Sequence, residues 1–257
     1  MSYRLTFLGT GTSHGVPSIG CKCETCMSND PKDKRLRSSI LLQRNHVNIV
    51  IDTGPEFRIQ CLRENIDHLE SVIYTHAHAD HLNGIDDLRS FTSKDRTLPL
   101  YGDSKTIAEI IDRFSYIGNG TINNTVIPNL SLNVLRPYVK VNIDGFDITP
   151  LIINHGKLEI YGYRIFNSAY LTDCNSIPKE SYKYLKNLDL LILDALQHHP
   201  HKTHFTLEEA IEVAKDIGAK KTLFTHIAHG IKNDRDSKLL DDNMALSYDT
   251  LSIELEE

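Results

Sequence analysis

The feature that most constrains this chain is a dense set of histidines directly after a short apolar run. Residues 72–74 are β-branched or aromatic and are typical of the end of a buried strand. The run continues into His76, His78, Asp80 and His81. Residues two apart at a strand end project the same way, so His76 and His78 can hold one ion. Three imidazoles and a carboxylate so close together favour a zinc, manganese or iron site over a histidine-rich surface turn.

The pattern His76-x-His78-x-Asp80-His81 resembles the signature of the metallo-β-lactamase superfamily. The resemblance implies an α/β fold, a four-layer αββα sandwich, with a one- or two-metal site at one edge of its sheets. Members of that superfamily hydrolyse β-lactams, thioesters, phosphodiesters and RNA. The motif therefore indicates the superfamily and leaves the substrate open.

Length and composition are compatible with one domain spanning residues 1–257, of which 40% are hydrophobic. No apolar run reaches the roughly 18 residues of a membrane span, and no signal peptide precedes the first strand-like run, so we expect a cytoplasmic protein. The formal net charge of −6 argues against a stable nucleic-acid complex. Superfamily relatives are often homodimers, and the sequence leaves the oligomeric state open.

A glycine-rich loop at residues 9–17 follows the strand-like run Tyr3–Leu8. Its glycines lack the Gly-Lys-Ser/Thr of a phosphate-binding P-loop. The order Gly-Thr-Gly-Thr-Ser-x-Gly-Val-Pro instead resembles the PhnP-like phosphoribosyl cyclic phosphodiesterases, a branch related to ribonuclease Z.

Three of the five cysteines, Cys21, Cys23 and Cys26, are clustered in a second candidate site. Three thiolates can occupy three corners of a zinc tetrahedron, although three free thiols in a mobile loop would give the same pattern. In PhnP-like enzymes such a cluster pairs with a histidine three positions after the last active-site histidine, and His226 and His229 have that spacing. The resemblance implies one structural zinc held by these cysteines and His229.

Three more active-site ligands are implied by the resemblance, each after a strand-like run: His155, Asp173 and His226. Two divalent cations are then expected, manganese or zinc, with iron also acceptable. The implied assignment is His76, His78 and His155 on one cation, Asp80, His81 and His226 on the other, and Asp173 between them.

His204 lies just before a predicted helix that Thr206 can cap. Its position in His-x-Thr-x-x-x-Ala resembles the histidine that faces the substrate phosphate in ribonuclease Z and PhnP-like enzymes. We expect His204 and Asp80 to be catalytic, with one of them supplying the leaving-group proton. The nearby histidines of segment 198–201 surround Pro200 and are expected to be exposed and solvated.

The remaining hydrophobic pattern predicts alternating strands and helices. Strands are expected at residues 38–44, 47–51, 98–101, 132–141, 146–153, 160–165, 190–193, 221–225 and 252–255. Helices are expected at residues 55–65, 82–91, 104–116, 178–185 and 206–218. Segment 118–129 reads as a loop and segment 230–248 as helix or loop, while Cys61 and Cys174 are expected not to bind metal.

These features predict a metal-dependent phosphodiesterase that attacks a small cyclic or nucleotide-like phosphodiester with a metal-activated hydroxide. A ribonuclease Z-like nuclease is the first alternative, although no Gly/Pro-rich arm for gripping tRNA is evident. A glyoxalase II-like thioesterase is a weaker one, because it explains neither the cysteine cluster nor His204. A non-enzymatic zinc module would need only one compact site.

Overall fold

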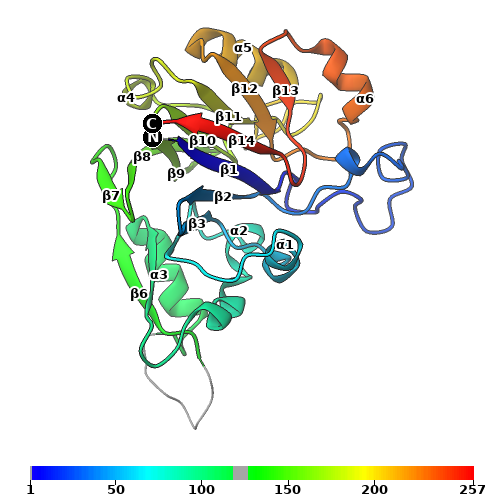
Figure 1. Cartoon of the computed structure of the whole chain (residues 1–257). Helices are drawn as coiled ribbons and strands as arrows, with labels where there is room; N and C mark the ends of the chain where they lie inside the picture. Colours follow the sequence, from blue (N-terminus) through cyan, green and yellow to red (C-terminus); the bar gives the residue numbers. More distant parts are fainter. Residues whose placement is uncertain (1, 118–126) are drawn as a thin grey trace.

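Two seven-stranded mixed sheets form the centre of the computed structural model, which describes residues 2–117 and 127–257 (Figure 1). The strand order is β14-β1-β2-β3-β4-β5-β6 in the first sheet and β13-β12-β11-β10-β9-β8-β7 in the second. Helices flank both sheets, and the predicted αββα sandwich is confirmed.

The first sheet contains β1 (Ser2–Gly9), β2 (Ser39–Arg44), β3 (Val47–Ile51), β4 (Ser71–Ile73), β5 (Leu98–Gly102), β6 (Leu130–Val134) and β14 (Ser252–Glu256). The second contains β7 (Val141–Ile143), β8 (Phe146–His155), β9 (Leu158–Ile165), β10 (Ser168–Leu171), β11 (Leu190–Asp194), β12 (Lys221–Thr225) and β13 (Met244–Leu246). The helices are α1 (Phe57–Arg63), α2 (Ala79–Leu82), α3 (Ser104–Arg113), α4 (Lys179–Tyr182), α5 (Leu207–Ile217) and α6 (Asn233–Asp236). Short 3₁₀ helices lie at η1 (Pro31–Asp33), η2 (Ile85–Phe91) and η3 (Ser237–Leu239).

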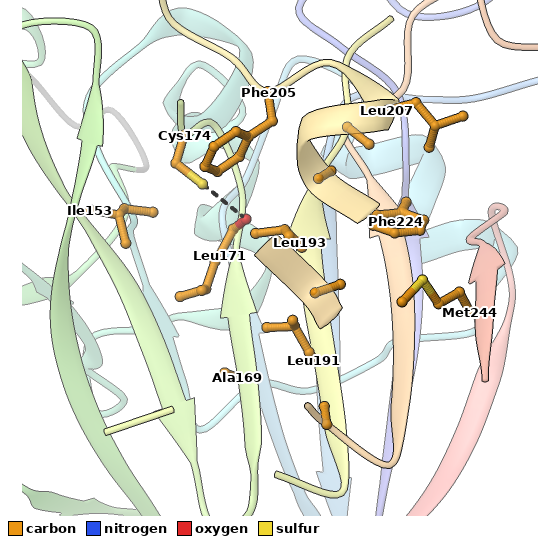
Figure 2. Close-up of a cluster of buried hydrophobic side chains, with 14 of the residues drawn as sticks. Ile153, Ala169, Leu171, Cys174, Leu191, Leu193, Phe205, Leu207, Phe224 and Met244 are labelled. Atoms are coloured by element: carbon orange, nitrogen blue, oxygen red, sulfur yellow. Dashed lines mark hydrogen bonds between the residues drawn. The ribbon is translucent and has the colours of Figure 1, made fainter. Parts of the chain in front are cut away.

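Three buried apolar clusters separate the four layers. The central one joins the facing sides of the two sheets, for example Phe7 of β1 with Ile192 of β11. A second packs the outer face of the first sheet against α1 and α3. The third packs the second sheet against α5, with Leu191, Leu207 and Phe224 among its members (Figure 2). Each sheet thus buries both faces, which explains the continuously apolar inner strands.

Parallel pairing determines where the site forms. Strands β3 to β6 run parallel to one another in the first sheet, and β10 to β13 do so in the second. The carboxyl ends of parallel strands lie at the same edge, where ligands of open α/β sheets bind. The segments after β4, β10 and β12 therefore carry His76, Asp173 and His226 to one edge of the sandwich.

The single helix predicted at 82–91 is wrong, because the chain forms α2 and then the 3₁₀ helix η2. Gly84 separates the two, and a Cβ added there would lie 2.2 Å from the Gly54 carbonyl oxygen. The buried residues Leu82, Ile85, Leu88 and Phe91 recur every three positions. That period matches the three residues per turn of a 3₁₀ helix.

The strand predicted at 132–141 is also wrong, because the chain crosses between sheets there. Strand β6 pairs with β5, whereas β7 pairs with β8 in the other sheet. Between them Pro137 cannot donate a ladder hydrogen bond, and Tyr138 adopts a positive φ of 64°.

Helix α5 follows its predicted boundaries. Thr206 and Glu209 form a reciprocal capping box, and Gly218 ends the helix in the left-handed conformation. Segment 230–248 contains α6, η3 and the strand β13. Residues 118–126 of the predicted loop lie outside the described residues. Within residues 2–117 and 127–257, no helix has the length and apolar character that crossing a bilayer requires.

Candidate metal centre

The histidine motif lies between the end of β4 and the short helix α2. His76 and His81 are buried, whereas His78, at the N-cap position of α2, is exposed. Asp52 fixes the start of this turn, because its carboxylate accepts hydrogen bonds of 2.8 Å from both the backbone N–H and the hydroxyl of Thr75. The motif therefore projects from a fixed strand end.

Asp173 lies at the centre of the assembled cluster. Its carboxylate is 3.3 Å from Nε2 of His81, 2.7 Å from Nδ1 of His226 and 3.7 Å from Nε2 of His76. Asp173 belongs to three sets whose donor atoms lie within 4.8 Å of one another. One set contains His76 and His78, another contains Asp80, His81 and His226, and the third contains Asp194, His204 and His226. This is the arrangement that two cations sharing one carboxylate require.

His155, at the end of β8, borders the first of these sets. Its ring centroid is 5.0 Å from that of His78 and 5.7 Å from that of His76. Its Nδ1 lies 3.1 Å from the carbonyl oxygen of Thr203, so this nitrogen donates and Nε2 remains for a ligand. Burial lowers the pKa of His155 to about 4, which leaves the ring neutral and able to bind metal.

Two buried nitrogens show that the pocket suits cations. Among the described residues, Nε2 of His76 and Nε2 of His81 have no hydrogen-bond partner. Burial places the pKa of His76 well below its usual range. Burial also lowers the pKa of His81, but the carboxylates of Asp173 and Asp80 outweigh it and raise that pKa well above normal. A divalent cation would satisfy both nitrogens and neutralise the surrounding carboxylates.

Two aspartates of this centre were missed in the sequence. Asp52 directly follows β3 and contacts Nδ1 of His81 at 2.7 Å. Asp194 is the last residue of β11 and contacts Nδ1 of His204 at 3.2 Å. Both are fully buried. Each follows an apolar strand at the edge where the histidines gather, and that placement was the available signal. They orient histidine rings in the way that outer carboxylates orient metal-bound histidines.

His204 lies within the assembled centre. It is buried, and its ring stacks on that of His226 with centroids 4.9 Å apart and planes 10° from parallel. Its centroid is 4.8 Å from that of His155. Burial lowers the pKa of His204, so the neutral ring predominates near neutral pH. The ring therefore lies beside His155 and His226, in a set that also contains Asp173 and Asp194.

The cysteine cluster assembles at a separate place. The sulfurs of Cys21, Cys23 and Cys26 lie 3.2, 3.4 and 3.7 Å from Nδ1 of His229. These four residues form a set that could hold one metal. Ile227 exchanges backbone hydrogen bonds with Thr10 and Thr12, so the loop that leads to the cysteines pairs with the segment that carries His226 and His229.

The segment around Pro200 corrects one expectation. His198 is not simply solvated, because its side chain is only 27% exposed. Its ring lies 2.7 Å from a carboxylate oxygen of Glu208 and 3.4 Å from one of Asp236. His199 and His201 are exposed, as predicted. Cys61 and Cys174 are buried in apolar clusters, and the Cys174 thiol donates to the carbonyl oxygen of Leu171 (Figure 2).

Comparison with known proteins agrees with this geometry. Residues 47–227 match the family model described as a beta-lactamase superfamily domain. The crystal structure of a diphosphatase from the PhnP family superposes with a TM-score of 0.93 at 40% identity, covering 99% of this chain and 98% of that one. The chain belongs to the metallo-β-lactamase superfamily, in its PhnP-like branch.

Two curated relatives are similar over part of their length. An octanoyltransferase of Porphyromonas gingivalis is 37% identical over 233 residues, which is 88% of this chain and 46% of that protein. A ribonuclease Z of Listeria innocua is 30% identical over 166 residues, which is 63% of this chain and 48% of that enzyme. The chain thus spans about half the length of these relatives.

Proposed function

We propose that this protein is a dinuclear metal-dependent phosphodiesterase that hydrolyses a small cyclic or nucleotide-like phosphodiester. The observation that carries the proposal is the position of Asp173, which lies with His76 and His78 in one set and with Asp80, His81 and His226 in another. Two adjacent cations clamp the attacking and leaving oxygens of a phosphoryl centre. A site with a single cation would not need a shared carboxylate.

In this proposal His76, His78 and His155 hold one cation, Asp80, His81 and His226 hold the other, and Asp173 is shared. When bound, the cations supply an acidified water and offset charge on the phosphoryl oxygens. Mixed imidazole and carboxylate donors accept zinc, manganese or iron. The cysteine cluster with His229 holds, in this proposal, one structural zinc.

His204 and Asp80 are the proposed proton donors. Asp194 binds Nδ1 of His204, which leaves Nε2 to face the substrate. An approaching phosphate anion favours the protonated imidazole, because opposite charges raise the pKa of a histidine. The protonated ring can then stabilise a phosphoryl oxygen and give its proton to the leaving oxygen.

The comparisons support a phosphorus substrate. The 40%-identical relative is a diphosphatase from the PhnP family, and several other relatives are ribonuclease Z enzymes. The ribonuclease similarity favours a second candidate, a nuclease acting on RNA ends. The acidic net charge of −6 favours the small substrate, because tight RNA binding requires basic surface.

A substrate comparison tests the proposal. Protein loaded with manganese or zinc should hydrolyse bis(p-nitrophenyl) phosphate far faster than a thioester or a β-lactam. Faster thioester cleavage would reject it in favour of a glyoxalase II-like enzyme. Tight, salt-sensitive tRNA binding with cleavage at the 3′ end would instead support the nuclease.

A further inference from the structure

His198 lies outside the metal centre and links the loop that carries His204 to helix α6. Nδ1 of its ring is 2.7 Å from Oε1 of Glu208, in the first turn of α5. Nε2 is 3.4 Å from Oδ2 of Asp236, the last residue of α6. A neutral imidazole has one N–H group and a protonated imidazole has two. Both carboxylates therefore meet an N–H group only when His198 carries its charge.

The surroundings of the ring favour this charge. Burial lowers the pKa of His198, but the carboxylates of Glu208 and Asp236 outweigh it and raise that pKa above its usual range. The basic neighbours on the α6 side are turned to other groups: Arg235 donates to both oxygens of Asp236, and the ammonium of Lys232 pairs with a glutamate between the clustered cysteines. The backbone N–H of Lys232 also donates to Asp236 at 2.7 Å. Asp236 is thus a fixed anchor for the ring.

The loop that begins at His198 ends at His204. Its two ends are joined by backbone hydrogen bonds of 3.0 and 2.9 Å between residues 196–197 and residues 205–207. Residues 199–202, between these ends, are exposed to solvent. His198 is the first residue beyond the joined ends, so its contacts determine where the exposed part of the loop lies.

His201 is the part of this loop that contacts His204. The two ring centroids are 5.0 Å apart, with planes 42° from parallel. The carbonyl oxygen of Lys202 accepts a hydrogen bond of 3.0 Å from the side chain of Asn175, which anchors the end of the loop next to His204. A change at His198 would therefore move His201 away from the His204 ring and leave the segments that carry the metal ligands in place.

We propose that protonated His198 is a positioning residue for the reaction, because by bridging Glu208 and Asp236 it fixes the loop that holds His201 against the His204 ring. The inference rests on the proposed phosphodiesterase function, in which His204 gives its proton to the leaving oxygen. A His204 ring without this neighbour adopts more orientations, so fewer bound substrates meet it in the productive one. The loss should appear in kcat and not in KM or in metal content.

The bridge also limits kcat at alkaline pH. Because the pKa of His198 is raised, the bridge is complete below the usual histidine value of about 6.5 and is lost as the pH rises through the raised value. We expect kcat per metal-loaded molecule to fall over that interval.

Two substitutions separate the charge of this side chain from its shape. At pH about 6, His198→Gln should lower kcat for bis(p-nitrophenyl) phosphate by about tenfold, with KM and metal content changed by less than about twofold. His198→Arg carries its charge at every pH, so it should retain kcat and remove the alkaline fall. His199→Gln, at the exposed neighbouring histidine, is the control and should match the unaltered protein throughout.

Unchanged kcat in His198→Gln would overturn the inference, as would an alkaline fall that persists in His198→Arg. A His198→Gln variant that loses metal in proportion to kcat would also overturn it, since the residue would then support the ligands. The route through the loop has its own test, because His201→Ala should lower kcat by a similar factor and the double variant should lose no more than either single one. Additive losses would contradict that route.

A titration without substrate separates this inference from the proposed function. In the zinc-loaded protein, the NMR signal of the His198 ring, assigned by its absence from His198→Gln, should titrate with a midpoint above the usual value of about 6.5. Glu208→Gln should lower that midpoint, because it removes one of the two facing charges. A raised midpoint in a protein that hydrolyses no phosphodiester would reject the proposed function and retain the bridge. Phosphodiester hydrolysis with a midpoint at or below about 6.5 would reject only the bridge.

Discussion

The histidine–aspartate centre and the cysteine cluster differ in how they are built. Asp80, His81, Asp173 and His226 are all buried and come from three segments, which follow β4, β10 and β12. In the cysteine cluster, three of the four residues lie within six positions and His229 is exposed. Four protein ligands close a zinc tetrahedron, whereas shared carboxylates and neutral imidazoles leave positions for a substrate. We therefore propose that the first site performs chemistry and that the second stabilises the fold.

The largest effect should come from Asp173→Asn. Removing the shared anion should lower phosphodiester turnover by more than about a hundredfold, because even outer partners of metal ligands contribute roughly 10- to 100-fold. Metal analysis should show loss of active-site metal with zinc at the cysteine cluster retained. Asp144→Asn, at an exposed position in the turn between β7 and β8, is the control.

Full metal content and near-normal turnover in the Asp173 variant would break the distinction between the two sites.

His204→Ala should cost roughly 10²- to 10⁴-fold in kcat, the usual range for a general acid. Its metal content should match that of the unaltered protein, because His204 is proposed to face substrate and not to bind a cation. A variant that loses metal would make His204 a ligand. His199→Ala, at an exposed neighbouring histidine, should leave both quantities unchanged.

Asp52→Asn tests whether the buried centre depends on residues beyond its ligands. Asp52 contacts Nδ1 of His81, so its loss should weaken metal affinity by about 10- to 100-fold. Titration with a competing chelator measures this change. The exposed Asp67→Asn is the control, and equal affinities in the two variants would show that Asp52 does not orient the ligand.

The smallest effect on chemistry should come from Cys23→Ser. One zinc should be lost and the melting temperature should fall, while kcat per folded molecule should change by less than the His204 variant changes it. Cys61→Ala, a buried cysteine outside the cluster, should keep the zinc. A Cys23 variant that abolishes turnover with its active-site metals in place would give the cluster a catalytic role.

The sequence predicted most of the sandwich because buried parallel strands produce long apolar runs, as in β11. The spacing of His76 and His78 after β4 predicted a metal site, because the two-residue periodicity of side chains at a strand end can be read from the local sequence. Asp52 and Asp194 were not predicted as site residues. An aspartate after a strand resembles any turn residue until the fold brings it to a histidine.

The two wrong predictions, the helix at 82–91 and the strand at 132–141, also failed because of tertiary contacts. The break at Gly84 depends on how closely Gly54 approaches, and the crossing at Pro137 depends on two sheets facing each other. Both contacts join residues that are far apart in the sequence, so the local hydrophobic pattern does not indicate them. The engagement of His198 by Glu208 and Asp236 is likewise a tertiary contact.

Element-specific anomalous diffraction from crystals of the metal-loaded protein tests the central claim most directly. The account predicts two peaks about 3.5–4 Å apart on either side of the Asp173 carboxylate, and a third enclosed by Cys21, Cys23, Cys26 and His229. A single peak at the cysteine cluster, with none beside Asp173, would contradict it.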